Sequence, residues 1–379
     1  MKTLLQLSDP AREYGKLQSE MQAVLTNVLA SGEYVQESII GELEDRVARR
    51  CGVRYGIATA SGTMALIVGL KALGVGPGDE VIAPAYTAIS TTAAITHAGA
   101  SIVLADISPQ TLTLDPHDVV RRITPHTRAI IPVHLHGQLA DMDALRAIAE
   151  EHELLLLEDA ALAVGALYYN RPAGSLGDAA AVSFAPSKIL GGIGWGGMVL
   201  TDSTVLATRA RQIAGFGPAS LPASQQAETN HDLEGYNAQL STLQAAALLV
   251  KIPYVDTWLG RRRAIAARLD TVCDRLGIQR LQPLPGSLPS YRAYVVLVPY
   301  RDDVSIRLQQ IGINARAHYV PALHLRPVYA RLNYTRGQFP VAERLTERIL
   351  CLPCHPHLSD DDVDYLASAL ESVALTVAG

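Results

Sequence analysis

The stretch Leu154-Leu155-Leu156-Leu157-Glu158-Asp159 is an apolar run that ends in two carboxylates, as expected of a buried strand with acidic groups at its end. Lys188 follows a second strand-like run, Ala179-Ala180-Ala181-Val182-Ser183-Phe184, and precedes the glycine-rich stretch 191–197. An amine can form an imine with an aldehyde cofactor, and a carboxylate can keep a basic ring nitrogen protonated. Asp159 and Lys188 at two strand ends therefore indicate pyridoxal phosphate (PLP), whose protonated ring is an electron sink.

Two segments carry groups suited to the phosphate of such a cofactor. Ala60-Ser61-Gly62-Thr63-Met64-Ala65-Leu66 begins an apolar, alanine-rich helix, and its first amides and the Thr63 hydroxyl are expected to bind a phosphate. Ser183 precedes Lys188 and offers a second hydroxyl. Asn237 lies just before another predicted helix, 240–249.

The composition suits an enzyme of the α/β class. The chain has 379 residues, of which 49% are hydrophobic and 18% charged, and this argues against disorder. A net charge of -5 offers no electrostatic basis for binding nucleic acid or a membrane. The N-terminal apolar stretch is too short for a signal peptide, and no run approaches the ~18 apolar residues of a transmembrane helix. Four scattered cysteines do not suggest a disulfide framework, so we expect a cytoplasmic protein.

Short apolar runs alternate with helical stretches between residues 55 and 201, which predicts βαβ units and a mostly parallel sheet with helices on both faces. In such sheets ligands bind at the carboxyl ends of the strands, where Asp159 and Lys188 fall. The predicted strands are Glu80–Ala83, Ser101–Ala105, Ala129–Val133, Leu154–Glu158, Ala180–Phe184 and Met198–Thr201.

The flanking regions are predicted to be mainly helical. Helices are expected at 10–30 and 41–50, and residues 214–234 are expected to form a long exposed loop. Beyond it we expect helix from Leu240 to about Leu276 with a break near Pro253, a strand at 294–298, and helices at 304–311 and 360–373. We therefore predict a large cofactor domain, 1–255, and a smaller domain, 256–379.

These segments, in this order, resemble the DegT/DnrJ/EryC1/StrS family, and the resemblance runs from about Gly32 to Leu358. Segments that also carry it are Gly76-Pro77-Gly78-Asp79-Glu80-Val81-Ile82, Val133-His134-Leu135-His136-Gly137, Glu158-Asp159-Ala160-Ala161, Gly235-Tyr236-Asn237 and Leu352-Pro353-Cys354-His355-Pro356-His357-Leu358. The resemblance implies a fold-type-I PLP enzyme: an α/β domain with a mostly parallel sheet, plus a smaller α+β C-terminal domain. Most members are nucleotide-sugar aminotransferases.

The resemblance also implies roles for individual residues. Lys188 and Asp159 would be catalytic, and glutamate or glutamine would donate an amino group to a keto sugar on a nucleoside diphosphate. The enzyme would be a homodimer with shared sites. The implied cofactor-binding positions are Gly62, Thr63, Ala88, Asp159, Ala161, Leu162, Ser183, Lys188 and, from the other subunit, Asn237; the implied substrate positions are His318, Tyr319 and His324.

Three positions depart from the family pattern. The family commonly has an aromatic residue where this chain has Ala88, glutamine at Leu162 and arginine at Gln239. Losing the aromatic stack and a polar neighbour leaves imine chemistry possible but is expected to loosen the cofactor or enlarge the site. Sugar dehydratases of the family have histidine at the position of Lys188, so the lysine argues against that class.

Other interpretations of these segments remain. The segment Cys351-Leu352-Pro353-Cys354-His355-Pro356-His357 has zinc-ligand residues but lacks a second pair at the usual spacing, and residues 191–197 do not match a dinucleotide or P-loop fingerprint. The run Arg261-Arg262-Arg263 is interpreted as a solvated helix face. Alternative functions are amination of a keto-cyclitol, non-transaminating PLP chemistry, or a PLP-binding regulatory protein without turnover.

Overall fold

A computed structural model describes residues 4–215 and 233–377. Its centre is a seven-stranded sheet in the order β1-β9-β8-β5-β4-β2-β3, in which β9 runs antiparallel to β1 and β8 and the other neighbours are parallel. The predicted mostly parallel sheet is confirmed. The strands are β1 (Tyr55–Thr59), β2 (Glu80–Pro84), β3 (Ser101–Ala105), β4 (Thr127–Ile130), β5 (Leu155–Asp159), β8 (Ala179–Ser183) and β9 (Gly197–Thr201).

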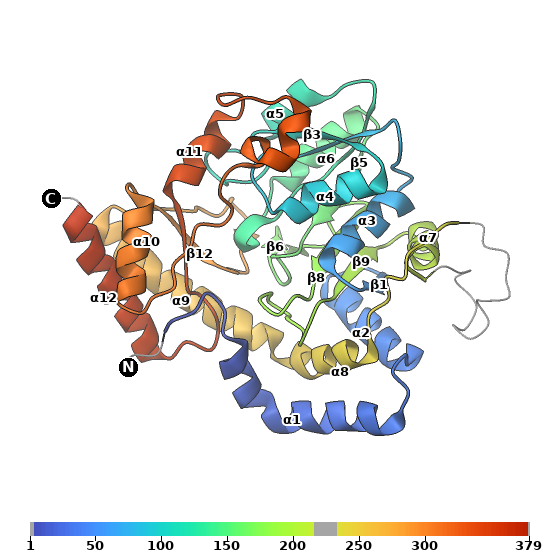
Figure 1. Ribbon diagram of the computed structural model, residues 1–379, viewed down its shortest axis with the longest axis horizontal. Helices are drawn as coiled ribbons and strands as arrows, with labels where there is room; N and C mark the ends of the chain where they lie inside the picture. The colour runs from blue at the N-terminus through green and yellow to red at the C-terminus, as the bar shows by residue number, and fades with distance from the viewer. Residues whose placement is uncertain (1–3, 216–232, 378–379) are drawn as a thin grey trace.

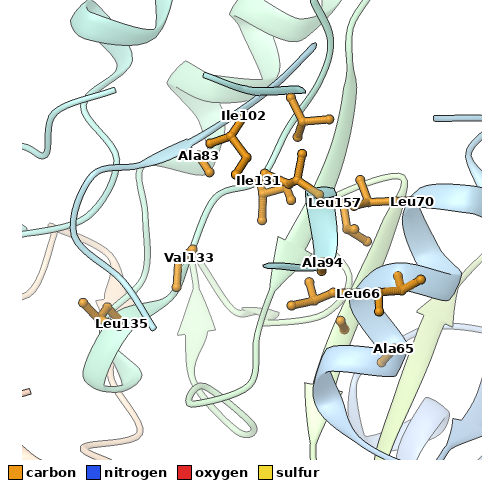
Figure 2. Close-up of a cluster of buried hydrophobic side chains, with 14 of the residues drawn as sticks. Ala65, Leu66, Leu70, Ala83, Ala94, Ile102, Ile131, Val133, Leu135 and Leu157 are labelled. Carbon is orange, nitrogen blue, oxygen red and sulfur yellow. The ribbon is translucent and has the colours of Figure 1, made fainter. Parts of the chain in front are cut away.

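Alternating side chains of these strands divide the large core between the two faces of the sheet. On β5, Leu157 packs toward α3 (Gly62–Ala72), α4 (Ile89–Ala98) and α7 (Thr204–Gly215), as Figure 2 shows for the α3 side. Leu156 faces the opposite core, formed with α2 (Glu37–Arg50), α6 (Met142–Glu151) and α8 (Thr242–Lys251). Because both faces are covered by helices, the strands are apolar on both sides, as parallel strands usually are.

The C-terminal part is built on a second sheet at one end of the molecule (Figure 1). The antiparallel strands β10 (Gln279–Arg280), β12 (Tyr294–Leu297) and β13 (Ile349–Leu352) pack with the helices α9 (Val255–Leu276), α10 (Arg301–Gln310) and α12 (Asp360–Val377). The N-terminal segment joins this part, because Leu5 and Ile313 form a bridge. The division at residues 255 and 256 stays a prediction.

The remaining elements belong to the N-terminal segment and to the connections between the elements above. They are α1 (Pro10–Ser31), α5 (Pro116–Arg122), α11 (Pro340–Arg348), the strands β6 (Leu167–Tyr168), β7 (Arg171–Pro172) and β11 (Ser287–Leu288), and 3-10 turns at Leu135–Gly137, Ile252–Tyr254, Leu323–Leu325 and Pro327–Leu332. Within the described ranges, no helix is both long and apolar enough to cross a lipid bilayer.

Several element boundaries differ from the sequence predictions for local reasons. Helix α2 begins at Glu37, four residues before the predicted Gly41, because a glycine is tolerated within the first turns. Strand β4 ends at Ile130 rather than Val133, which instead forms a single bridge with Asp159. Most of the predicted loop 214–234 lies outside the described residues.

The interpretation of Arg261-Arg262-Arg263 as a solvated helix face is wrong for its middle residue. Arg262 is only 4% exposed, and its Nη1 donates to the carbonyls of Tyr291 and Cys354 at 3.2 and 2.5 Å. Helix α9 thus uses this guanidinium to tie together two chain segments of the C-terminal part. Adjacent helix residues point in directions about 100° apart, so one arginine of the three can be buried.

Candidate active site

Asp159 ends β5 as a buried carboxylate whose two oxygens are both engaged. Its Oδ2 accepts a hydrogen bond of 2.7 Å from Thr91 Oγ1, and its Oδ1 accepts one of 3.2 Å from the amide of Ala161. Thr91 lies on α4 and also contacts the Thr87 hydroxyl at 3.2 Å. These hydrogen bonds orient the carboxylate and hold it at the carboxyl edge of the sheet. Sequence reasoning missed Thr91, because its partner lies far away in the chain.

Lys188 lies in the loop that leaves β8, close to Asp159. Its amide donates to the Ala185 carbonyl at 2.9 Å, which folds the chain back directly after the strand. Burial and, to a smaller extent, the charge of Arg292 lower the pKa of the Lys188 amine to about 8, although the Asp159 carboxylate opposes both. An amine with this pKa is substantially neutral near pH 8, as a nucleophile or proton acceptor must be.

The glycine-rich loop after Lys188 is anchored from two helices. Lys251 of α8 donates to the Gly191 carbonyl at 2.6 Å and pairs with Glu13 of α1 at 2.5 Å. The Oε1 atom of Gln244 accepts hydrogen bonds from the amides of Ile193 and Gly194 at 3.0 and 3.1 Å. These hydrogen bonds from side chains restrain the loop after Lys188, although the loop is rich in glycine.

The start of α3 forms a narrow cradle with β8 and β9. Ser61 caps the helix, because its Oγ accepts from the Met64 amide at 3.1 Å. A Cβ on Gly62 would lie 2.7 Å from the Cβ of Ser183, and one on Gly197 would lie 2.5 Å from the Ser61 carbonyl carbon. The helix N-terminus can approach the Ser183 hydroxyl only because glycines stand at both positions.

This cradle fits the phosphate of PLP. The amides at the start of α3 and the Ser183 hydroxyl belong to the cradle, and a helix N-terminus favours an anion. The predicted site residues Gly62 and Ser183 are thus brought together, and Lys188 and Asp159 lie near each other. The missed Ser61 carried a signal, since serine before an apolar helix is a common N-cap.

The predicted substrate-side residues His318 and Tyr319 meet the sheet through Tyr86. The Tyr86 hydroxyl donates to the His318 carbonyl and accepts from the Tyr319 amide at 3.0 Å. Burial lowers the pKa of His318 and raises the pKa of Tyr319 to about 12. Near pH 7 this side of the site therefore offers a neutral imidazole and a phenol that keeps its proton.

Near Tyr86 lie His136, in the 3-10 turn Leu135–Gly137, and Cys351, on β13. The His136 Nδ1 is 3.9 Å from the Cys351 Sγ, and the rings of His136 and Tyr86 have centroids 6.4 Å apart. Burial lowers the pKa of His136 to about 3, so its ring is uncharged at neutral pH. The charge of Arg292 also lowers the pKa of His136. No sequence motif pointed to Arg292.

The predicted positions Ala88 and Leu162 are both placed at this edge of the sheet. Ala88 is the N-cap residue of α4, three residues before Thr91. Leu162 is buried in the turn after Asp159, and its carbonyl accepts from Ser290 Oγ at 3.1 Å. Ala161 is held by its amide's bond to Asp159. The contacts of these side chains with a cofactor stay predictions.

Asn237 is exposed and lies near the start of α3. The carbonyl of the next residue, Ala238, accepts from the Ala60 amide at 2.6 Å. Gln239 is exposed as well. An exposed side-chain amide beside the cradle is accessible to a second subunit. That Asn237 reaches the phosphate site of a partner subunit stays a prediction.

His324 is not brought to this cluster. Its Nε2 pairs with Glu343 Oε1 at 2.9 Å, and its ring packs on Phe339 with centroids 4.7 Å apart. Next to it in the chain, the Leu323 amide donates to the Ala85 carbonyl at 2.8 Å. The substrate-side prediction for His324 therefore has no support from its contacts.

The cysteine- and histidine-rich segment is used in packing. Cys351 and Cys354 are buried free thiols, and His357 Nε2 lies 3.3 Å from Glu13 Oε2. Burial raises the pKa of both thiols to about 12, which keeps them protonated. Over residues 4–215 and 233–377, no group of three or more histidine, cysteine or acidic side chains is arranged to hold a metal ion.

Comparison with known proteins gives consistent matches over nearly the whole chain. A sequence model of the DegT/DnrJ/EryC1/StrS aminotransferase family matches residues 16–371. A pleiotropic regulatory protein of Geobacillus stearothermophilus is 38% identical, with 96% of each chain covered. The dTDP-3-amino-3,4,6-trideoxy-alpha-D-glucose transaminase of Streptomyces venezuelae is 38% identical, covering 91% of this chain and 89% of that protein. The crystal structure of S. venezuelae DesV with a ketimine intermediate matches with a TM-score of 0.93 at 36% identity, covering 98% and 99%.

Proposed function

The chain belongs to the DegT/DnrJ/EryC1/StrS aminotransferase family, whose members depend on PLP, and we propose that it aminates a keto sugar carried on a nucleoside diphosphate. Glutamate or glutamine would be the amino donor. The support for the acceptor comes from relatives named UDP-2-acetamido-2-deoxy-3-oxo-D-glucuronate aminotransferase, dTDP-3-amino-3,4,6-trideoxy-alpha-D-glucose transaminase and GDP-perosamine synthase. The observation that carries the proposal is Lys188 beside Asp159, next to the Gly62–Ser183 cradle.

Each part of the bound cofactor has a proposed holder. Gly62, Thr63 and Ser183 would hold the phosphate, and Asp159 would keep the ring nitrogen protonated. Bound PLP supplies an electron sink that stabilises negative charge at the carbon under reaction. Thr91 supports that role, because its hydrogen bond keeps the Asp159 carboxylate oriented.

Lys188 is the proposed proton carrier. Its neutral Nζ would take the proton from the α-carbon of the donor and deliver it to the cofactor carbon that receives the amino group. The lowered pKa of Lys188 suits this exchange, because the amine can both accept and release a proton near pH 8. Anchoring of its loop by Lys251 and Gln244 keeps the Nζ within reach while it is not covalently bound.

The acceptor is proposed to bind against His318 and Tyr319. Their neutral imidazole and protonated phenol can hydrogen-bond sugar hydroxyls without placing a charge on the site. His324 is left out of this set, because Glu343 occupies its Nε2. In a homodimer, the partner subunit's Asn237 would complete the phosphate site.

The test is a two-part reaction of the PLP-loaded enzyme. Glutamate or glutamine should convert the aldehyde form, which absorbs near ~420 nm, to the amine form, and a nucleotide-linked keto sugar should restore it. The amine form is incubated with dTDP-, UDP- and GDP-linked keto sugars and with a keto-cyclitol. Return of the aldehyde form with the cyclitol alone would replace the proposed acceptor.

A regulatory role without turnover is the second candidate. One relative favours it, since the Geobacillus stearothermophilus protein is called a pleiotropic regulatory protein. The donor half of the reaction separates the two candidates, because a protein without turnover would keep the aldehyde form in the presence of every donor. Non-transaminating PLP chemistry would instead release an altered donor with no amine form accumulating.

A further inference from the structure

Arg292 is held at the edge of the site by an unusual piece of backbone. It lies two residues before β12, and its amide donates to the His136 carbonyl at 3.0 Å. The residue before it, Tyr291, has a φ of 48°, and His136 and Gly137 have φ values of 58° and 87°. Such conformations are strained for a residue with a side chain and persist where the surrounding structure requires them. The two segments are locked together, since a Cβ on Gly137 would lie 3.0 Å from the Arg292 nitrogen.

The Arg292 guanidinium is buried without an acceptor. The residue is 9% exposed, its Nε has no partner, and no hydrogen bond or ion pair of its side chain is found within the described part of the chain. Five other arginines of the described ranges have a buried Nε without a hydrogen bond, and each places another nitrogen on an acceptor or lies beside an acid. They are Arg50 with Asp256, Arg122 with Asp118, Arg262 with carbonyls, Arg280 with Asp274, and Arg301 with Asp302 and Thr346.

The groups that face Arg292 do not neutralise it. Its charge lowers the pKa of Lys188 and of the His136 and His318 rings, which places all three within electrostatic reach. The groups whose negative charge would raise the pKa of Arg292 are the Tyr319 phenol and the thiols of Cys351 and Cys354. Because their own pKa values are raised to about 12, these groups stay protonated and uncharged near pH 7. A buried cation normally has an anionic partner, so this arrangement is complete only when an anion arrives from outside.

We propose that Arg292 binds a carboxylate of the substrate, specifically the α-carboxylate of the amino-acid donor. The inference rests on the proposed transamination, in which the donor's α-carbon must come to Lys188, and its carboxylate is bonded to that carbon. A guanidinium matches a carboxylate with two parallel hydrogen bonds, which a lysine cannot do. The cofactor phosphate already has its own cradle at Gly62 and Ser183. The other source of the same group is an acceptor sugar with a carboxylate.

The first measurement needs no turnover. Binding of glutarate, which has carboxylates but no amine, is measured by calorimetry with the PLP-loaded wild type, Arg292→Gln and Arg292→Lys. We expect affinity to fall by about 30-fold or more in Arg292→Gln and by less in Arg292→Lys, because charge remains but the fork is lost. Equal affinity in all three proteins would overturn the proposal, whether or not the enzyme transaminates.

The second measurement identifies the source of the carboxylate. Single-turnover conversion to the amine form is compared for L-glutamate and for 4-aminobutyrate, which lacks the α-carboxylate. Arg292→Gln should weaken glutamate binding with a smaller effect on the limiting rate, and should leave 4-aminobutyrate unchanged. Loss confined to uronate-type acceptors in the return reaction would support the carboxylate site and assign it to the acceptor. If Arg292→Gln weakened binding equally for L-glutamate and 4-aminobutyrate, and affected neutral acceptors to the same extent, the proposed carboxylate site would be overturned.

The melting temperature of Arg292→Gln tests whether Arg292 has only a structural role, with variants of two other arginines as controls. Removing an uncompensated buried charge should leave the melting temperature of Arg292→Gln equal to or above that of the wild type. Arg262→Gln should instead lower it, because three carbonyls lose their donor. Arg316→Gln, at an exposed arginine that bonds Asn314, should leave glutarate binding unchanged. A melting temperature of Arg292→Gln as low as that of Arg262→Gln would assign Arg292 to folding instead.

Discussion

At the scale of single residues, the reactivity of Lys188 is set by what surrounds it. Desolvation is the largest cause of its lowered pKa, Arg292 adds to it, and Asp159 acts in the opposite direction. The Asp159 carboxylate does not restore the pKa of Lys188 to its ordinary value. Its two oxygens accept hydrogen bonds from Thr91 and from the Ala161 amide. The amine and the carboxylate can therefore have separate roles even though they are neighbours.

The pH dependence of cofactor capture follows from the pKa of Lys188. Only the neutral amine attacks an aldehyde, and a pKa lowered to about 8 makes that form abundant above pH 8. The rate at which cofactor-free enzyme captures PLP should rise about tenfold per pH unit below pH 8 and level off above it. An ordinary lysine, with a pKa of about 10.4, would continue to rise. Stopped-flow absorbance checks this, with N-acetyl-lysine methyl ester as the reference; a rate still climbing at pH 9.5 would contradict it.

Asp159→Asn should leave the fold intact and cut turnover severely, because a neutral amide cannot hold the proton on the ring nitrogen. Loss of a hydrogen bond to a charged group corresponds to roughly 1.5–3 kcal/mol. Thr91→Val is the matched control: it keeps the charge and removes one hydrogen bond to it, so its effect should be smaller. Steady-state kinetics of both variants decide the matter, and wild-type turnover in Asp159→Asn would remove the electrostatic role of Asp159.

At the scale of elements, close approach of α3 to β8 and β9 makes the phosphate cradle. Gly197→Ala should weaken PLP binding, since the new methyl group would meet the Ser61 carbonyl and push the helix start away. Gly76→Ala is the control, because a Cβ there meets nothing within 4 Å. PLP affinity is measured by fluorescence titration of the cofactor-free proteins. If Gly197→Ala binds PLP as tightly as Gly76→Ala does, the start of α3 is not the phosphate site.

A second element-scale prediction concerns the helices that anchor the glycine-rich loop. Lys251→Met leaves the Gly191 carbonyl and the Glu13 carboxylate without their cation, and breaking a buried pair in this way costs about 3–5 kcal/mol. Arg46→Met removes an exposed pair with Glu42 and should cost less than about 1 kcal/mol. Urea unfolding of the two variants gives the comparison, and equal midpoints would show that α1 and α8 do not anchor the loop.

At the scale of the whole molecule, the exposed Asn237 beside the cradle suggests sites shared between two subunits. If the partner subunit's Asn237 reaches the phosphate, Asn237→Ala should lose PLP on dilution, and subunits should dissociate with it. Mixing Asn237→Ala subunits with Lys188→Ala subunits should then restore one complete site per hybrid dimer. Sedimentation and PLP retention check this. A monomer with full PLP occupancy, or a mixture without recovered activity, would contradict a shared site.

The strands, the mostly parallel sheet and the pair Asp159–Lys188 were determined by the sequence itself, because each depends on local periodicity or on a position at a strand end. The Gly62–Thr63 helix start and Ser183 were predictable for the same reason. Only the tertiary structure decided which arginine of 261–263 is buried, that His324 binds Glu343, and that the Arg292 side chain has no hydrogen-bond partner among residues 4–215 and 233–377. These features depend on which distant segments meet, and a side chain's burial, partners and pKa are set by neighbours that sequence spacing does not reveal.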